Sequence, residues 1–281
     1  MSTTFTIAGR SIVRVPPDEL DRDPRGVLWL WEKPLTTATY CVACDPTVGI
    51  EGWHRTLRTQ DDTKTDNAAI EVIRIGDIAH GGQDVQVAEF AAPIDYVQCA
   101  QILNLLGRLY CGNDEDGQAL CIIEVYPGPG LLVQRELLST YGYHRLYTQP
   151  YLDTLVPQSR RNSPFGWYAT RQSVRDLWLK GLHHIHKRHV RIHSPWLVDE
   201  MADCEPDERN MAMRACFGRH DDRVRALLLA LWAAHHWSST IEFQETKVEQ
   251  TNAPPWQASA ITYDQMMSEW EEKFAELVGE D

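Results

Sequence analysis

Runs of apolar residues divide the middle of the chain into strands and helices. Residues 68–75 (AAIEVIRI) and 85–90 (VQVAEF) alternate between apolar and polar, 39–44 (TYCVAC) is a short apolar run, and 119–125 (ALCIIEV) is apolar through its length. These runs have the length of strands, and the last is typical of a buried central strand. Helical spacing of apolar residues predicts helices over 95–110, 131–141, 171–186 and 223–237, with Gly142 as the C-cap of the second.

Shorter elements complete the pattern. We expect an edge strand over 144–148, a Pro-, Arg- and Ser-rich loop over 149–166, a short strand over 190–193 and a helix near 198–201. The order is three strands, helix, strand, helix, strand and then helices, which predicts an α/β fold with a mixed central sheet flanked by helices. It is also the order of an RNase H-like core, although order alone leaves several α/β folds open.

The chain divides into three parts. Residues 1–36 form a lead-in with a possible strand pair around 5–14, and 37–240 form the α/β domain. Residues 241–281 comprise a polar linker and an acidic helix over 263–278 with an apolar stripe. That stripe can pack on the core or dock on a partner.

Composition narrows the class of protein. No run approaches the roughly 18 apolar residues of a membrane span, and no basic-then-apolar leader opens the chain. The seven cysteines are scattered and odd in number, which favours a reducing compartment over a disulfide framework. Cys41 and Cys44 form a CxxC with no second pair, so we interpret them as strand residues and not as a zinc knuckle. We expect a soluble intracellular protein without a membrane partner.

Charge is unevenly distributed along the chain. The formal net charge is −13, yet residues 158–193 hold eight Lys/Arg and five His against one acid, Asp176. Residues 238–281 hold ten acids against two lysines. A basic middle and an acidic tail are therefore averaged in the total, so the negative net charge does not exclude a nucleic-acid partner.

Isolated acids fall where strands and helices end. Asp45 ends the first apolar strand, Glu124 lies near the end of the central one, and Asp221 and Asp222 begin an apolar helix. Such carboxylates can converge at one edge of a sheet, where Mg²⁺ or Mn²⁺ would neutralise them, and two such ions can hydrolyse a phosphodiester. Each acid also has a structural explanation: Asp45 can begin a turn, one aspartate of the pair can be a helix N-cap, and Glu124 can pair with an arginine.

The residues around these acids resemble the nuclease domain of viral DNA-packaging terminase large subunits. The matching segments are Asp45-Pro-Thr-Val-Gly with Thr-Asp66-Asn-Ala-Ala, then Ile-Ile-Glu124-Val-Tyr-Pro-Gly-Pro-Gly, Phe165-Gly-Trp-Tyr-Ala-Thr-Arg171, and Gly218-Arg-His-Asp221-Asp222-Arg-Val. The last segment is the most specific, and the resemblance extends over about residues 37–240.

The resemblance implies an RNase H-like endonuclease that cuts concatemeric double-stranded bacteriophage DNA in the host cytoplasm. It implies two divalent ions, Mg²⁺ or Mn²⁺, held by Asp45, Glu124 and Asp221 or Asp222. Asp66 would be an auxiliary acid, although the family motif brings this acid closer after the first aspartate than here. The implied partners are the terminase ATPase part, the small subunit and the portal. No GxxxxGK[ST] loop occurs, since no lysine follows a glycine, so we expect no ATP hydrolysis by this chain.

DNA binding requires cations along the path of the backbone. Our candidates are Arg160, Arg161 and Arg171, then Lys187 and Arg188, with His220 placed to orient a phosphate or a water. No signature of base readout is present, so we expect little sequence specificity. The histidine run over 183–193 fits no closed set of metal ligands by its spacing. The alternatives are a junction resolvase, an RNA–DNA hybrid nuclease or a non-catalytic DNA-packaging subunit.

Overall fold

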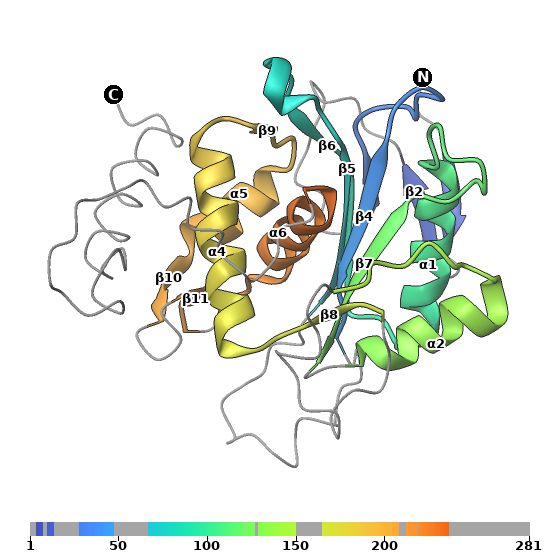
Figure 1. The fold of residues 1–281 in the computed structure, drawn as a ribbon. Coiled ribbons are helices and arrows are strands. Elements are labelled where there is room, and N and C mark those ends of the chain that lie inside the picture. The colour runs from blue at the N-terminus through green and yellow to red at the C-terminus, as the bar shows by residue number, and fades with distance from the viewer. Residues whose placement is uncertain are drawn as a thin grey trace, which may run out of the picture.

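The computed structural model of the chain describes residues 4–7, 10–13, 28–47, 67–126, 129–149, 165–207, 212–217 and 219–235. They form a mixed, curled sheet with helices on both faces (Figure 1). The strands are β1 (Thr4–Ile7), β2 (Arg10–Val13), β3 (Leu28–Leu30), β4 (Tyr40–Asp45), β5 (Ala68–Arg74), β6 (Asp84–Ala92), β7 (Leu120–Tyr126), β8 (Trp167–Tyr168), β9 (Val190–Arg191), β10 (Cys204–Asp207) and β11 (Ala212–Ala215). The helices are α1 (Tyr96–Leu109), α2 (Gly130–Tyr141), α4 (Arg171–His186), α5 (Pro195–Ala202) and α6 (Asp222–Ala234), with a short 3-10 helix, η3 (Ile78–His80).

The central sheet has the order β3-β6-β5-β4-β7-β8, and β9 pairs with β6. Strands β4, β5 and β6 are successive antiparallel neighbours, whereas β7 is parallel to β4 and β8 is parallel to β7. Helices α1 and α2 provide the connections around β7 that parallel pairing requires. The expectation of an α/β fold with a mixed sheet is confirmed.

The two faces of the sheet bury separate apolar clusters. Along β4, Val42 and Cys44 pack on the face that α1 and α2 cover, and Cys41 and Ala43 pack on the face that α4, α5 and α6 cover (Figure 1). This alternation follows from the two-residue period of a strand. It also places the CxxC cysteines on opposite faces, and all seven cysteines are free.

Helix α6 lies between the sheet and helix α4 (Figure 1). Its residues from Val224 to Ala233 are buried, except that Arg225 is partly exposed. A helix that is apolar on all sides has to be covered on all sides, which explains why this one lies inside the domain. Arg225 is therefore a positively charged, partly exposed side chain in a buried part of the helix.

Several elements differ from the sequence-based expectation. Residues 144–148 form only isolated bridges, such as Cys121 with Leu146, and the strand next to β7 is β8 instead. A strand of two residues has too few positions to show an apolar alternation, so the pattern did not reveal it. Strand β3 lies in the segment we expected to be a lead-in, yet it pairs with β6 at the edge of the sheet.

Other expectations fall partly outside the described residues. The pair β1–β2 matches the strand pair expected around residues 5–14, and β10 and β11 form a hairpin that we did not predict. The expected helix over 263–278 and most of the loop over 149–166 lie outside the described residues. None of the described helices is long and apolar enough to cross a membrane.

Candidate functional site

Two of the expected acids lie side by side at the ends of neighbouring strands. In the parallel pairing of β4 with β7, Cys44 is opposite Ile123, and the next residues are Asp45 and Glu124. Glu124 is 5% exposed, and the Asp45 side chain keeps 18% of its exposure. The fold therefore brings both carboxylates to the C-terminal edge of the central strands, as the strand pattern predicts.

Arg225 of helix α6 joins these two carboxylates. Its Nη2 lies 2.6 Å from both Oε1 and Oε2 of Glu124, and its Nε lies 3.3 Å from Oδ2 of Asp45. The neighbouring acids raise the pKa of the guanidinium above its usual range, although burial lowers it. Arg225 is thus a permanent positive charge between the two acids. Arg225 is not among the site residues expected from the sequence.

The ionisation of Asp45 is strongly affected by its surroundings. Burial raises the pKa of Asp45 well above its ordinary value, and the negative charge of Glu124 raises it further. Arg225 lowers this pKa, while Asp222 and Asp221 raise it. Asp45 therefore favours a bound proton or another cation, in spite of the positive charge of Arg225.

The start of α6 brings Asp221 and Asp222 to the same edge of the sheet as Asp45. Oδ2 of Asp222 accepts the backbone N–H of Asn67 at 3.1 Å and lies 3.6 Å from Nδ1 of His220. Asp221 occupies the N-cap position, but its side chain makes no capping hydrogen bond within the described part of the chain. Of the two, Asp222 has the greater effect on Asp45. The expected auxiliary acid, Asp66, lies outside the described residues.

A second network of buried charge fixes the first turn of α6. Arg223 donates from Nε to Glu89 at 3.0 Å and from Nη1 to Glu200 at 2.5 Å, and its backbone N–H donates to Glu200 at 2.9 Å. Glu89 is opposite Glu71 across β5 and β6, and Gln86 donates to Glu71 at 2.7 Å. These contacts join α6 to the sheet and to α5, so they hold Asp222 in place.

The candidate DNA-binding residues lie in two separate regions. Arg171 begins α4, directly after β8, whose Trp167 pairs with Glu124, so it is at the carboxylate edge together with His220. Arg160 and Arg161 lie outside the described residues. Lys187 and Arg188 follow the other end of α4 and are far from that edge.

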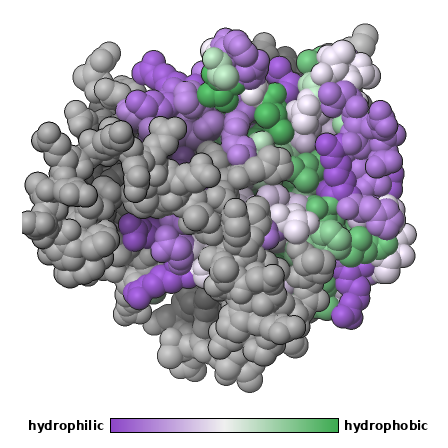
Figure 2. All heavy atoms as spheres, in the orientation of Figure 1, coloured by the Kyte–Doolittle hydropathy of each residue, from purple (hydrophilic) through white to green (hydrophobic). Residues whose placement is uncertain are grey.

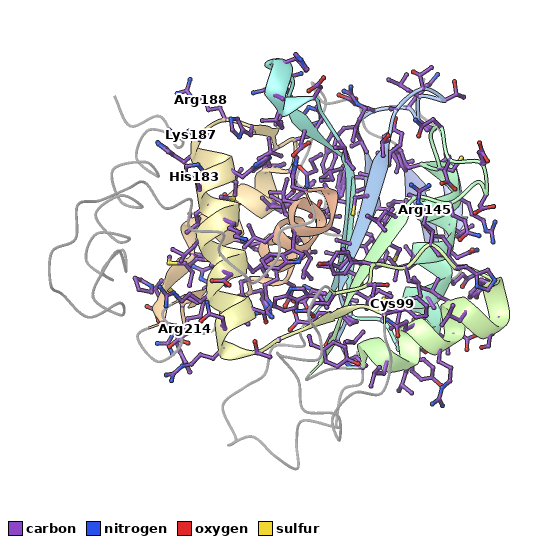
Figure 3. The ribbon with its side chains drawn as sticks, viewed as in Figure 1. Cys99, Arg145, His183, Lys187, Arg188 and Arg214 are labelled. Atoms are coloured by element: carbon purple, nitrogen blue, oxygen red, sulfur yellow. The ribbon has the colours of Figure 1, made fainter. Side chains whose placement is uncertain are left out.

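Lys187 and Arg188 contribute to a basic hollow of about 570 Å³ beside β9 and the turn between β5 and β6. Its lining also includes Arg74, His189 and Arg191. Figure 3 shows Lys187 and Arg188 at the end of α4, where the visible surface is hydrophilic (Figure 2). Arg74 is paired with the first residue of β4, and Asp45 is the last, so roughly 17 Å of strand separates this hollow from the carboxylates.

A group of metal-ligating side chains lies at the end of α6 that is remote from Asp222. Asp84, His184 and His235 have ligand atoms that all lie within 4.8 Å of one another, so this group can bind a metal ion. Among the described residues no other set of three His, Cys, Asp or Glu side chains is that close, and the acids around Arg225 are more widely spaced. A site for two ions 3.5–4 Å apart spreads its ligands more widely than a site for one.

In the sequence His184 stands out only as one of the five histidines of residues 183–193. Its partners, Asp84 and His235, are 100 and 51 residues away in the sequence, so no local spacing relates the three. Arg225, by contrast, has a local signal. It is three residues after Asp222 in a helix that is apolar after Arg225, and residues with this spacing share one face.

Comparison of the chain with models of protein families gave no match. Comparison with curated protein sequences gave none either.

Proposed function

We propose that the chain is a metal-dependent endonuclease with an RNase H-like fold, similar to the nuclease part of terminase large subunits. Its substrate would be the double-stranded, concatemeric DNA that a virus cuts during genome packaging. The observation that carries the proposal is the pairing of Asp45 and Glu124, from two parallel strands, with Arg225 of the buried helix, at an edge where the charge of Asp222 also acts on Asp45.

The arrangement of elements supports the proposed fold class. Three antiparallel strands (β4, β5, β6) are followed by α1, β7, α2 and β8, and then by the helices that cover the other face. This is the order expected of an RNase H-like core. The acids that the resemblance assigns to the active site are at the strand ends and the helix start where that core would place them.

The residues at this edge fit divalent metal ions. The acids raise one another's affinity for positive charge, and hard carboxylate oxygens are the ligands that Mg²⁺ and Mn²⁺ prefer. Asp45, Glu124 and Asp222 would hold the ions. Bound there, two ions would activate a water and stabilise the leaving oxygen of a phosphodiester.

The other residues would orient the DNA and the acids. His220, whose Nδ1 lies 3.6 Å from Asp222, is placed to hydrogen-bond a phosphate oxygen or a water. Arg171 lies at the same edge and would contact the DNA backbone. Arg225 would hold the Asp45 and Glu124 carboxylates at the spacing seen here. The described residues show no arrangement of side chains typical of base recognition, so we expect cleavage to depend little on the DNA sequence.

One observation favours a different function. Because Arg225 pairs with both Asp45 and Glu124, it can satisfy the two carboxylates without a metal. A packaging subunit that binds DNA and does not cut it would keep such an ion-pair cluster. The two functions differ in whether the acids bind divalent ions.

The test is cleavage of supercoiled plasmid by the full chain with Mg²⁺, Mn²⁺ or EDTA. Wild type is compared with Asp45→Asn and Glu124→Gln, and with Glu205→Gln as the control, because Glu205 is a partly exposed acid paired with Arg214. We expect nicking and linearisation with either metal, loss in the two site variants, and wild-type cutting by the control.

Other outcomes separate the alternatives. Equal cutting by Asp45→Asn and wild type would refute this site. DNA binding without cutting in either metal, and without calorimetric Mn²⁺ binding that Asp45→Asn removes, would favour the non-catalytic subunit. Faster cutting of a four-way junction or an RNA–DNA hybrid than of duplex DNA would favour another RNase H-like nuclease over a terminase.

A further inference from the structure

Asp84, His184 and His235 come from three elements that meet at the end of the sheet opposite the carboxylate edge. Asp84 begins β6, His184 is in the last turn of α4, and His235 is the C-cap of α6. Nε2 of His184 lies 2.8 Å from Oδ2 of Asp84, and Nε2 of His235 lies 2.7 Å from the same oxygen. The two imidazole rings are tilted to each other with centroids 4.7 Å apart.

The carboxylate at the centre of this group is fixed in position. Asp84 is fully buried, and its other oxygen, Oδ1, accepts the backbone N–H of Gly76 at 2.8 Å. The group therefore presents one buried carboxylate and two imidazoles, with ligand atoms within 4.8 Å of one another, and side chains of these types are common ligands of transition metals.

We propose that Asp84, His184 and His235 bind one transition-metal ion of the Zn²⁺ type. Two imidazole nitrogens with one carboxylate oxygen suit Zn²⁺, whereas Mg²⁺ and Ca²⁺ prefer ligand sets made of oxygen. Ligands about 2.0–2.2 Å from a tetrahedral Zn²⁺ are roughly 3.3–3.5 Å apart. The two Nε2–Oδ2 distances of 2.8 and 2.7 Å would thus lengthen by only about 0.6 Å as the ion takes the place of the two hydrogen-bonding protons.

The surroundings supply the supports that such a site needs. The hydrogen bond from Gly76 to Oδ1 turns Oδ2 toward both imidazoles, the role that partners of a metal ligand usually have. His235 keeps 21% of its side-chain exposure, which gives an ion a route from solvent. The ring of His189 packs edge-on against that of His184, with centroids 5.1 Å apart, but His189 is not within ligand distance of the whole group, so a water would supply the fourth ligand.

This site is separate from the proposed nuclease centre. Asp222 and His235 are at opposite ends of the 13-residue helix α6, which is about 20 Å long. The ion would join β6, α4 and α6, and so would hold in place the helix that carries Asp222 and Arg225. Its role would be structural, and the inference does not depend on nuclease activity.

The experiment is metal binding by the full chain after treatment with EDTA and removal of the chelator. Zn²⁺ binding is measured by calorimetry, the melting temperature is followed with Zn²⁺ or excess Mg²⁺, and Co²⁺ is added to record its d–d absorption. The variants are Asp84→Asn, His184→Gln and His235→Gln. The control is His80→Gln, because Asp77 and His80 form a similar but exposed Asp–His pair with an Nδ1–Oδ2 distance of 2.8 Å.

We expect one Zn²⁺ per chain, a higher melting temperature with Zn²⁺ than with Mg²⁺, and a Co²⁺ spectrum of a tetrahedral site. His235→Gln, at the most exposed ligand, should lose all three effects while remaining folded, and His80→Gln should keep them. Zn²⁺ binding that is absent from wild type, or unchanged in His235→Gln, would overturn the proposal. Loss of nuclease activity in Asp45→Asn with normal Zn²⁺ binding would show that the two sites are independent.

Discussion

Arg225 directs a single guanidinium nitrogen at both oxygens of Glu124, at 2.6 Å each, from within a buried helix. The same guanidinium lies 3.3 Å from Asp45, so one cation is shared by two acids. If divalent ions bind these acids, they have to share the carboxylates with Arg225 or displace it. The loss of stability on replacing Arg225, with and without divalent ions, therefore tests whether these acids bind metal.

Replacing Arg225 with methionine removes the positive charge and keeps most of the side-chain volume. We expect the free energy of unfolding in EDTA to fall by about 3–5 kcal/mol, because two acids at the protein interior lose their shared counter-ion. With millimolar Mg²⁺ or Mn²⁺ a large part of that loss should be recovered. Urea denaturation of wild type and variant under both conditions measures the difference.

Arg214→Met is the matched control, since the exposed Arg214 of β11 pairs with Glu205 at 3.0 Å (Figure 3). It should cost no more than about 1 kcal/mol, with or without metal. A loss for Arg225→Met that divalent ions leave unchanged would mean that the acids around Arg225 bind no ions.

Asp221 and Asp222 can be separated by their roles. Asp222 accepts the backbone N–H of Asn67 and faces His220, whereas the side chain of Asp221 makes no capping bond within the described residues. We expect Asp222→Asn to lower the cleavage rate by roughly 100-fold or more, at least as much as loss of an outer-shell group of a metal site. Asp221→Asn should lower it only a few-fold.

Initial rates of plasmid nicking at several Mn²⁺ concentrations measure both variants. If Asp222→Asn is a ligand variant, higher Mn²⁺ should restore part of its activity. The reverse ranking of the two variants would make Asp221 the ligand and Asp222 the residue that orders the start of β5.

The sequence revealed the strands and the positions of the acids because both have local signals. Strand β7 is a continuous apolar run, and Glu124 stands out in it as a charge. The boundaries of α4, Arg171–His186, agree with the apolar spacing, and Thr170 and Ser173 form a capping box at its start. Patterns of this kind involve only residues close together in the sequence, so the elements they indicate can be predicted without knowing the fold.

The partners of the charged residues could not be read in the same way. Arg225 is 101 residues from Glu124, and Asp84 is 100 residues from His184, so only the packing of α4 and α6 on the sheet brings them together. Strand β8 was missed for a related reason. Its two residues are strand only because β7 offers a free edge, and no pattern within two residues can show that.

Gly130 should be sensitive to substitution because it packs directly against the main chain of Glu124. A Cβ atom at Gly130 would lie 2.0 Å from the carbonyl oxygen of Glu124 and 2.8 Å from Cα of Val125. We expect Gly130→Ala to lower the free energy of unfolding by about 1–3 kcal/mol, as overpacking does, and to reduce cleavage by displacing Glu124. Urea denaturation and plasmid nicking measure the two effects.

Gly117→Ala provides the comparison. Gly117 has a φ of 65° in a turn with open space around it, so alanine adds backbone strain without a collision. It should cost stability and leave cleavage at the wild-type rate. Cleavage by Gly130→Ala at the rate of Gly117→Ala would show that the main chain at Glu124 tolerates displacement.

Asp176 should make the stability of the protein depend on pH in an unusual direction. Its side chain is buried in α4, Gln172 donates to Oδ1 at 2.8 Å, and Oδ2 has no hydrogen-bond partner among the described residues. Burial raises the pKa of Asp176 above its ordinary value, although Gln172, Lys180 and Arg175 lower it. The folded protein therefore binds this proton more tightly than the unfolded chain does.

It follows that the contribution of Asp176 to stability is fully present below the unfolded pKa of about 3.9 and is lost as pH rises through the higher folded value. Asp176→Asn removes the ionisation, so at pH 7 we expect it to be more stable than wild type by about 1–3 kcal/mol, the range for a buried polar group without a partner. The difference should shrink toward pH 4. Urea denaturation from pH 4 to 8 tests this, with the exposed Asp116→Asn as the control whose difference from wild type should stay constant. A stabilisation by Asp176→Asn that grows as the pH falls would mean that the carboxylate is held ionised by a cation in the folded protein.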